Sequence, residues 1–315
     1  MKDLLDVSGR PQSYARSPSA FMAYAFIVES FLIIVFNGFV FGFIMLAPDR
    51  RTQRHYCILA GSVVFEFIFA CTYFTYGLQL VYVIRNYGAH IPLVSRWECL
   101  NKVHSLLLLF ITPEAGILSL SIAIDRLLSV FAPVRYILLP PYYPLLLFLC
   151  SFLSTAVGFV FTYIANYGTR NLLEVSAECS LAEVVTPNMF KALRYIRIVT
   201  SLIGAILYIP VGYRLRQIIK RANRHVALSN IESTKLRQMT LSIGLITLSQ
   251  LVFFALPDAI LLFSSNRYRE IVFFLNLNKS VVNLLIIVFT QQELREFLFR
   301  KFWKKDQCTI VRFIK

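Results

Sequence analysis

The chain has 315 residues, of which 57% are apolar and only 16% are charged, and its formal net charge is +15. A soluble domain with so few charged residues could not cover its surface with polar groups, so the composition excludes an ordinary water-soluble protein. The cations are concentrated in connecting segments, as the positive-inside rule expects, so nucleic acid is not an expected partner. We therefore expect an integral membrane protein whose partner is the lipid bilayer.

Residues 1–20 are polar and include Pro11 and Pro18. They lack the short apolar core and small-residue cleavage site of a secretory signal. We expect these residues to form an extracellular N-terminus, and the first apolar segment to serve as its own insertion signal.

Long apolar segments then follow one another along the chain. In hydrocarbon each backbone amide needs an internal partner, so apolar runs of about 20 residues must be helices. The segments are residues 21–47, 56–84, 103–124, 142–164, 196–219, 239–263 and 271–289. The sequence thus predicts an all-α membrane protein, with a seven-transmembrane helix bundle over residues 21–290.

The connections differ in charge. Those that follow the odd-numbered segments carry most of the basic residues, including Arg50, Arg51, Arg54, Arg214, Arg216, Lys220, Arg221, Arg224, Lys235 and Arg237. The opposite connections hold fewer cations. We therefore expect a multi-pass protein of the plasma membrane with its N-terminus outside and its C-terminus in the cytoplasm.

The end of the chain has an amphipathic pattern. Leu294, Phe297, Leu298 and Phe302 fall on one helical face among basic residues. Residues 291–315 are therefore expected to form a short amphipathic cytoplasmic helix and tail, with Cys308 as a candidate palmitoylation site.

The most specific motif follows the third segment. Asp125 and Arg126 are adjacent, Pro133 lies seven residues after the arginine, and Arg135-Tyr136 comes next. An acid beside an arginine at a membrane boundary can hold it in a resting pair, and its release offers a cation to a cytoplasmic partner. Plain positive-inside anchoring is the simpler alternative.

This string resembles the DRY-containing stretch of rhodopsin-like (class A) G-protein-coupled receptors. The resemblance implies a switch formed by Asp125, Arg126, Pro133 and Arg135, a small-molecule ligand, and a heterotrimeric G protein as partner. The sequence departs from that family at Ala255, where a tryptophan is usual. At Arg237 many relatives have an acid that restrains the arginine of the third helix, so basal activity is expected.

Abundant Phe and Tyr, together with the string from Thr290 to Arg295, look like the nematode serpentine chemoreceptors. That resemblance implies a chemosensory receptor in the plasma or ciliary membrane of sensory neurons. It leaves the ligand, the G-protein subtype and the oligomeric state open.

Polar residues also fall within the apolar segments. Asn37, Glu66 and Asn283 occupy positions where the rhodopsin-like class has polar side chains facing the bundle centre. Such groups are costly in hydrocarbon, so we expect one hydrogen-bonded cluster; separate packing contacts are the alternative. Lys279 lies one turn before Asn283, and we hypothesise that it pairs with Glu66 and replaces the sodium ion usual in that class.

The outer half of the bundle is the expected ligand pocket. By helical offset its lining is Tyr76, His104, Ser105, Leu108, Thr112, Phe254, Asp258 and Phe273. This mostly apolar mixture suits a small semi-polar ligand, although each side chain could equally serve helix packing. Pro257 is expected to kink the sixth helix, because proline removes a backbone donor.

Two cysteines fall on the predicted outer side. Cys99 begins the third segment and Cys179 lies in the following outer loop, so an oxidising compartment favours a disulfide between them. Two separate thiols are the alternative.

Other functions remain to be weighed. Lys279 could hold retinal as a Schiff base, and Glu29, Glu66, Glu114, Asp258 and Lys279 could line an ion path in a transporter or channel. No catalytic or metal-ligand pattern occurs, and the histidines are scattered. We expect neither an enzyme nor a bound cofactor or metal.

Overall fold

A computed structural model of the protein describes residues 19–46, 53–88, 91–168, 173–222, 241–242, 244–263, 269–291 and 294–295. The expected N-terminal segment, Arg237, Cys308 and most of the expected C-terminal helix lie outside these residues.

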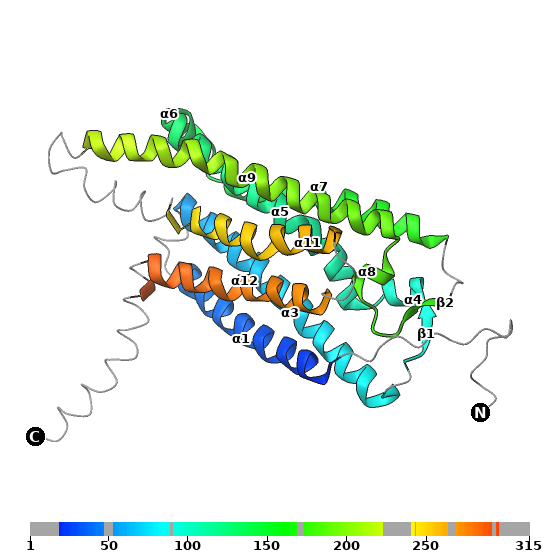
Figure 1. The fold of residues 1–315 in the computed structure, drawn as a ribbon. Helices are drawn as coiled ribbons and strands as arrows, with labels where there is room; N and C mark the ends of the chain where they lie inside the picture. Colours follow the sequence, from blue (N-terminus) through cyan, green and yellow to red (C-terminus); the bar gives the residue numbers. More distant parts are fainter. Residues whose placement is uncertain are drawn as a thin grey trace, which may run out of the picture.

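The described chain contains seven helices long and apolar enough to cross a membrane. Six are α1 (Ala20–Met45), α3 (Arg54–Tyr87), α5 (Val103–Phe131), α7 (Tyr143–Tyr167), α9 (Pro187–Ala222) and α12 (Arg269–Thr290). The sixth span, Gly244–Leu262, contains the π-turn η2 (Leu251–Ala255) and most of α11 (Leu256–Phe263). They lie side by side along one direction (Figure 1). The predicted seven-helix bundle is confirmed, and the protein is a multi-pass membrane protein.

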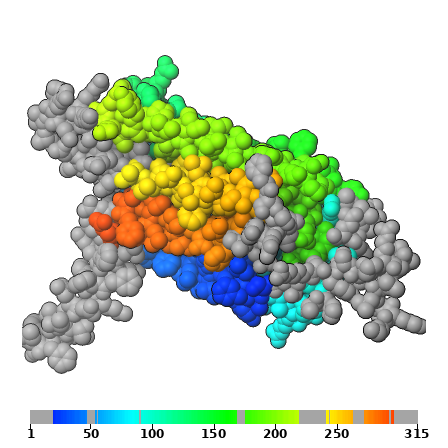
Figure 2. All heavy atoms as spheres, in the orientation of Figure 1, coloured from blue at the N-terminus to red at the C-terminus, as the bar shows by residue number. Residues whose placement is uncertain are grey.

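The helices differ in how far they are enclosed. In the most apolar 18-residue stretch of each helix, 67% of the residues are buried in α5 and 17% in α7. Helix α5 therefore lies in the interior of the bundle and α7 at its periphery. Large apolar side chains such as Phe21, Leu145 and Ile209 are exposed along the outer faces of the bundle. Figure 2 shows α9, the sixth span, α12 and α1 next to one another on one such face. Exposed apolar surface of this extent fits hydrocarbon as the solvent.

Two helix boundaries differ from the prediction by seven residues or more. The fifth span begins at Pro187 rather than at residue 196, because the arginines in its first turns are buried and paired instead of solvated. The third span continues to Phe131 rather than ending at residue 124, so Asp125 and Arg126 belong to its last turns and are buried.

Small elements mark the two ends of the bundle. At one end, which we call the hairpin end, β1 (Leu93–Ser95) pairs antiparallel with β2 (Leu173–Ser176). The short helices α4 (Arg96–Leu100) and α8 (Leu181–Val184) lie beside this hairpin, and α6 (Pro133–Leu138) lies at the opposite end, the α6 end (Figure 1).

Aromatic rings fill the interior between α1, α3 and the sixth span. Phe69 has its ring centroid 4.9 Å from that of Tyr73 and 5.5 Å from that of Phe254. Phe26 packs on Tyr73 at 5.7 Å. Buried rings in tilted contact contribute area and some specificity, so they hold these helices at defined distances.

Glycine allows one close helix contact near the candidate site. A Cβ atom added to Gly116 of α5 would lie 2.2 Å from the Thr200 hydroxyl and 2.7 Å from the Arg197 carbonyl oxygen. No larger residue fits there, so Gly116 fixes how closely α9 approaches α5.

Candidate functional site

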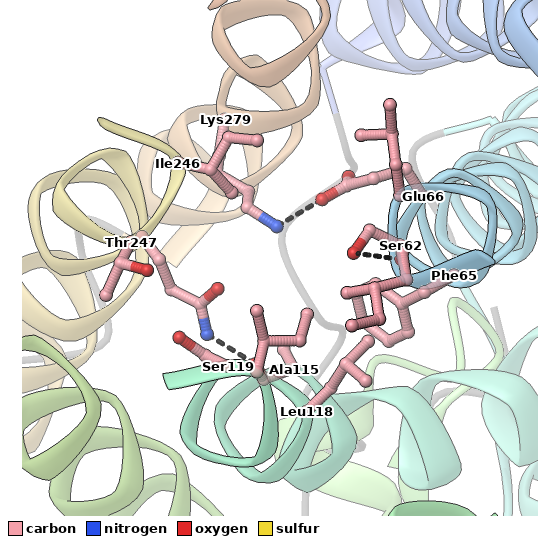
Figure 3. A pocket seen from close by; sticks show the side chains of 13 residues that line it. Ser62, Phe65, Glu66, Ala115, Leu118, Ser119, Ile246, Thr247 and Lys279 are labelled. Carbon is pink, nitrogen blue, oxygen red and sulfur yellow. Dashed lines mark hydrogen bonds and ion pairs between the residues drawn. The ribbon is translucent and has the colours of Figure 1, made fainter. Parts of the chain in front are cut away.

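A buried ion pair joins the second and seventh spans. The Lys279 ammonium of α12 donates to Oε1 of Glu66 in α3, and both side chains are almost fully buried. Figure 3 shows the two side chains pointing toward each other across the space between their helices. The Ser280 hydroxyl donates to the second carboxylate oxygen, Oε2. The predicted ion pair between Lys279 and Glu66 therefore forms.

The same carboxylate binds Asn283, whose Nδ2 donates to Oε1 at 2.8 Å. The Ser249 hydroxyl then donates to Oδ1 of Asn283, which extends the network to the sixth span. Asn37 does not take part: its Nδ2 donates to the Ile33 carbonyl of its own helix at 3.0 Å. The expectation of one cluster including Asn37 is wrong, because a turn of its own helix satisfies its amide.

A cavity adjoins this ion pair. It is lined by Ile58, Leu59, Ser62, Phe65, Glu66, Ala115, Leu118, Ser119, Ile122, Ile246, Thr247, Gln250 and Lys279 (Figure 3). The space not filled by atoms is about 510 Å³, including the part open to the surroundings. The Gln250 amide crosses this region and donates to the Ala115 carbonyl and, at 3.2 Å, to the Ser201 hydroxyl. The cavity therefore lies between α3, α5, the sixth span and α12, next to titratable groups.

A second charged cluster lies between the fifth and sixth spans. Arg194 donates from Nη1 to Oδ1 of Asp258 at 2.7 Å, and Arg197 donates to Oδ2 from Nε and also places Nη2 there. All three side chains are buried. Two guanidinium groups thus share one carboxylate.

Aromatic rings surround this cluster. The Arg194 guanidinium carbon lies 4.4 Å from the Phe190 ring centroid and 5.9 Å from that of Phe273. The Arg197 guanidinium carbon lies 4.8 Å from the Phe254 ring centroid. Such contacts stabilise a desolvated cation. They place the predicted pocket residues Phe254, Asp258 and Phe273 around two arginines that the sequence reasoning missed.

Arg194 was missed because the fifth span was expected to begin at residue 196, and Arg197 because it fell at the edge of that expected span. The spacing did contain a signal: Arg194 and Arg197 are three residues apart and face one side of a helix. An acid directly after the sixth-span proline is the obvious partner for such a pair.

The other predicted pocket residues lie on α3 and α5. The rings of Tyr76 and His104 lie 5.6 Å apart, and the Ser105 hydroxyl donates to the Cys179 carbonyl at 3.3 Å. Thr112 donates to the carbonyl of Leu108 one turn earlier in α5, and both are buried. Tyr76 and Leu108 belong to the same buried apolar cluster as Phe254 and Phe273, and the latter two contact the arginines.

The predicted disulfide is present between Cys99 and Cys179. Cys99 lies in α4, a helix separate from α5, which places the cysteine further from the third span than expected. The bond ties the connection that precedes α5 to the one that precedes α9 and holds the hairpin over the end of the bundle. A crosslink between distant parts of a chain restricts its unfolded state.

The motif at the α6 end is tightly packed. Nη2 of Arg126 lies 2.6 Å from Oδ2 of Asp125, and both side chains are buried. The Tyr136 hydroxyl donates to Oδ1 of Asp125 at 3.2 Å. Burial and the adjacent Asp125 carboxylate raise the pKa of Tyr136 to about 12, so the phenol stays protonated and keeps donating.

The helix that follows this motif is held to the second span. Pro133 is the first residue of α6, where its missing N–H costs nothing, and Arg135 is exposed. Arg54 of α3 donates to the carbonyls of Tyr136, Ile137 and Leu139. The turn that carries Tyr136 is therefore anchored.

Two further sequence features have defined positions. Pro257 is the second residue of α11, the helix that directly follows η2, where the ordinary helical hydrogen bonding has already changed. Glu114 accepts hydrogen bonds from Ser151 at 2.7 Å and from Thr155, both in α7. Glu114 thus joins α5 to α7 rather than facing the cavity.

The chain matches no protein-family model, and comparison with curated proteins finds no significant relative.

Proposed function

We propose that the protein is a G-protein-coupled receptor, a chemosensory one of the nematode serpentine type, which binds a small ligand near the hairpin end and activates a heterotrimeric G protein at the α6 end. The observation that carries the proposal is the Asp125–Arg126–Tyr136 arrangement at one end of a seven-helix bundle. A guanidinium restrained by a neighbouring acid, with Nε lacking a hydrogen-bond partner, is suited to release toward an incoming partner.

Further features support the proposal. The disulfide lies at the end of the bundle opposite to the Asp125–Arg126 pair. A receptor needs this arrangement, because disulfides persist on the outer, oxidising side and the G protein binds on the inner side. Phe254, the fourth residue of the π-turn η2, packs between the two charged clusters. Its ring centroid lies 4.9 Å from Nζ of Lys279 and 4.8 Å from the guanidinium carbon of Arg197. A ligand that moved either cation would therefore act on the sixth span.

Nucleotide exchange on purified G protein tests the proposal without a known ligand, because basal activity is expected. The full chain in lipid nanodiscs should accelerate GTPγS binding by at least one of the major Gα classes. Arg126→Ala should abolish the acceleration, whereas Arg216→Ala, which removes an exposed cation from α9, should retain most of it. Acceleration by no Gα class, or equal acceleration by the Arg126 variant, would contradict the proposal.

A transporter is the second candidate, and the cavity beside Glu66 and Lys279 is the observation that favours it. Intramembrane charged pairs next to a cavity are common along ion paths. Proteoliposomes with an internal pH dye provide the test: a proton flux that Lys279→Met abolishes would favour transport. A receptor should show no such flux.

A further inference from the structure

We propose that the ligand is a small organic anion, a carboxylate or a similar acid on an apolar body, and that Arg194 and Arg197 bind its charged group. The inference rests on the proposed function, because it names the ligand class of that receptor. Its test below measures binding alone, so it can fail or succeed separately from G-protein coupling.

The charges of the cluster formed by Arg194, Arg197 and Asp258 do not balance. Arg194 and Arg197 carry two positive charges and Asp258 carries one negative charge, so the cluster holds one surplus cation. Each of the three side chains is at most 4% exposed. Among the described residues, no second acid forms an ion pair with either arginine. A buried charge without a counterion is unfavourable, so the cluster favours one added anion.

The two arginines use their hydrogen-bond donors to different extents. Arg197 directs Nε and Nη2 to one carboxylate oxygen of Asp258, whereas Arg194 directs Nη1 to the other. The Nε of Arg194 is buried and has no hydrogen-bond partner. A guanidinium edge consisting of Nε and its neighbour matches the geometry of a carboxylate. Arg194 is therefore the arginine with donor capacity left for a ligand.

Aromatic side chains surround the two guanidinium groups. Phe190 and Phe273 contact Arg194, and Phe254 contacts Arg197. These rings keep water away from the guanidinium groups, which strengthens any ion pair formed there. They also suit the apolar body of a ligand. A small organic acid thus fits better than a fully hydrated inorganic anion.

The same contacts argue against an amine ligand. Asp258 is the acid of this cluster, but both of its oxygens already bind arginines, so neither is left for an ammonium group. An incoming cation would meet two guanidinium groups before that carboxylate. The cluster therefore selects anions over cations.

The position of Arg197 is set before a ligand arrives. Its carbonyl oxygen and Cα lie against Gly116, where a Cβ would be 2.7 Å and 2.9 Å away. A rigid helix contact holds the donors in place and lowers the ordering cost of binding. The Phe254 ring contacts both Arg197 and Lys279. A ligand bound at Arg197 can therefore change the position of Lys279 through this ring.

Thermal shift of the purified full chain, in one detergent and at constant ionic strength, tests the proposal. The probes are hexanoate, octanoate, benzoate and indole-3-acetate, each paired with its primary alcohol. We expect at least one carboxylate to raise the melting temperature by about 2 °C or more, and its alcohol to have no effect. The shift should persist in Arg126→Ala, which removes coupling but not the anion site.

Arg194→Gln is the informative variant. It leaves Arg197 and Asp258 as a neutral one-to-one pair, so the protein should fold, and the apparent affinity for the carboxylate should fall about tenfold or more. Lys191→Gln is the matched control, since Lys191 is an exposed cation of the same helix end. Equal shifts by the alcohols, an unchanged response in Arg194→Gln, or no shift by any carboxylate would overturn the proposal.

Discussion

Replacement of Lys279 by methionine probes the ion pair with Glu66. Removing one partner of a buried pair costs about 3–5 kcal/mol, since the remaining charge loses its counterion. Glu66 would keep its hydrogen bonds from Ser280 and Asn283, each a bond to a charged group. We therefore expect a loss near the lower limit, about 3 kcal/mol.

The assay is thermal unfolding of the purified protein, in which about 3 kcal/mol corresponds to a fall of roughly 6 °C for a bundle of this size. The double variant Lys279→Met, Glu66→Met removes both charges and should recover most of the loss, because apolar replacement of a buried pair is often neutral. A Lys279→Met loss below about 1 kcal/mol, with single effects that simply add, would refute the reasoning.

Sodium provides a second readout of the same variant. If the Lys279 ammonium replaces a cation beside Glu66, sodium should stabilise Lys279→Met relative to an equal concentration of choline and leave the unmodified protein unchanged. A sodium response in the unmodified protein would show that the ammonium does not fill that role.

Cys99→Ser and Cys179→Ser should each lower surface expression to the same extent, because either removes the same crosslink, worth about 2–5 kcal/mol; unequal losses would contradict this. Gly116→Ala should destabilise the protein by about 1–3 kcal/mol in thermal unfolding, whereas Gly158→Ala, whose added methyl group would meet no other helix within 4 Å, should not. Tyr136→Phe should raise basal nucleotide exchange, since it removes a donor from Asp125. The increase should be the same at pH 6 and pH 9, because the pKa of Tyr136 is raised to about 12 and the phenol is neutral at both; a pH-dependent increase would argue against this assignment.

Much of the fold could be predicted from the sequence alone. Hydrocarbon forces each apolar run to satisfy its own backbone, so seven runs of sufficient length determine seven helices whatever their packing. The Lys279–Glu66 pair could also be anticipated, because an isolated ammonium in the bilayer requires an acid at matching depth.

Other features depended on how the helices pack. Arg194 falls in a predicted loop and Arg197 at the edge of the predicted fifth segment, so neither looks paired from the sequence. Only the approach of the fifth and sixth spans places Asp258 beside both. Asn37 looks like a member of the central cluster, yet a carbonyl of its own helix satisfies it. Apolar runs and charges along the chain thus determine which segments enter the membrane, because that transfer is a property of each segment. Which polar groups meet inside is decided by the rotation and distance of neighbouring helices, which only the tertiary structure sets.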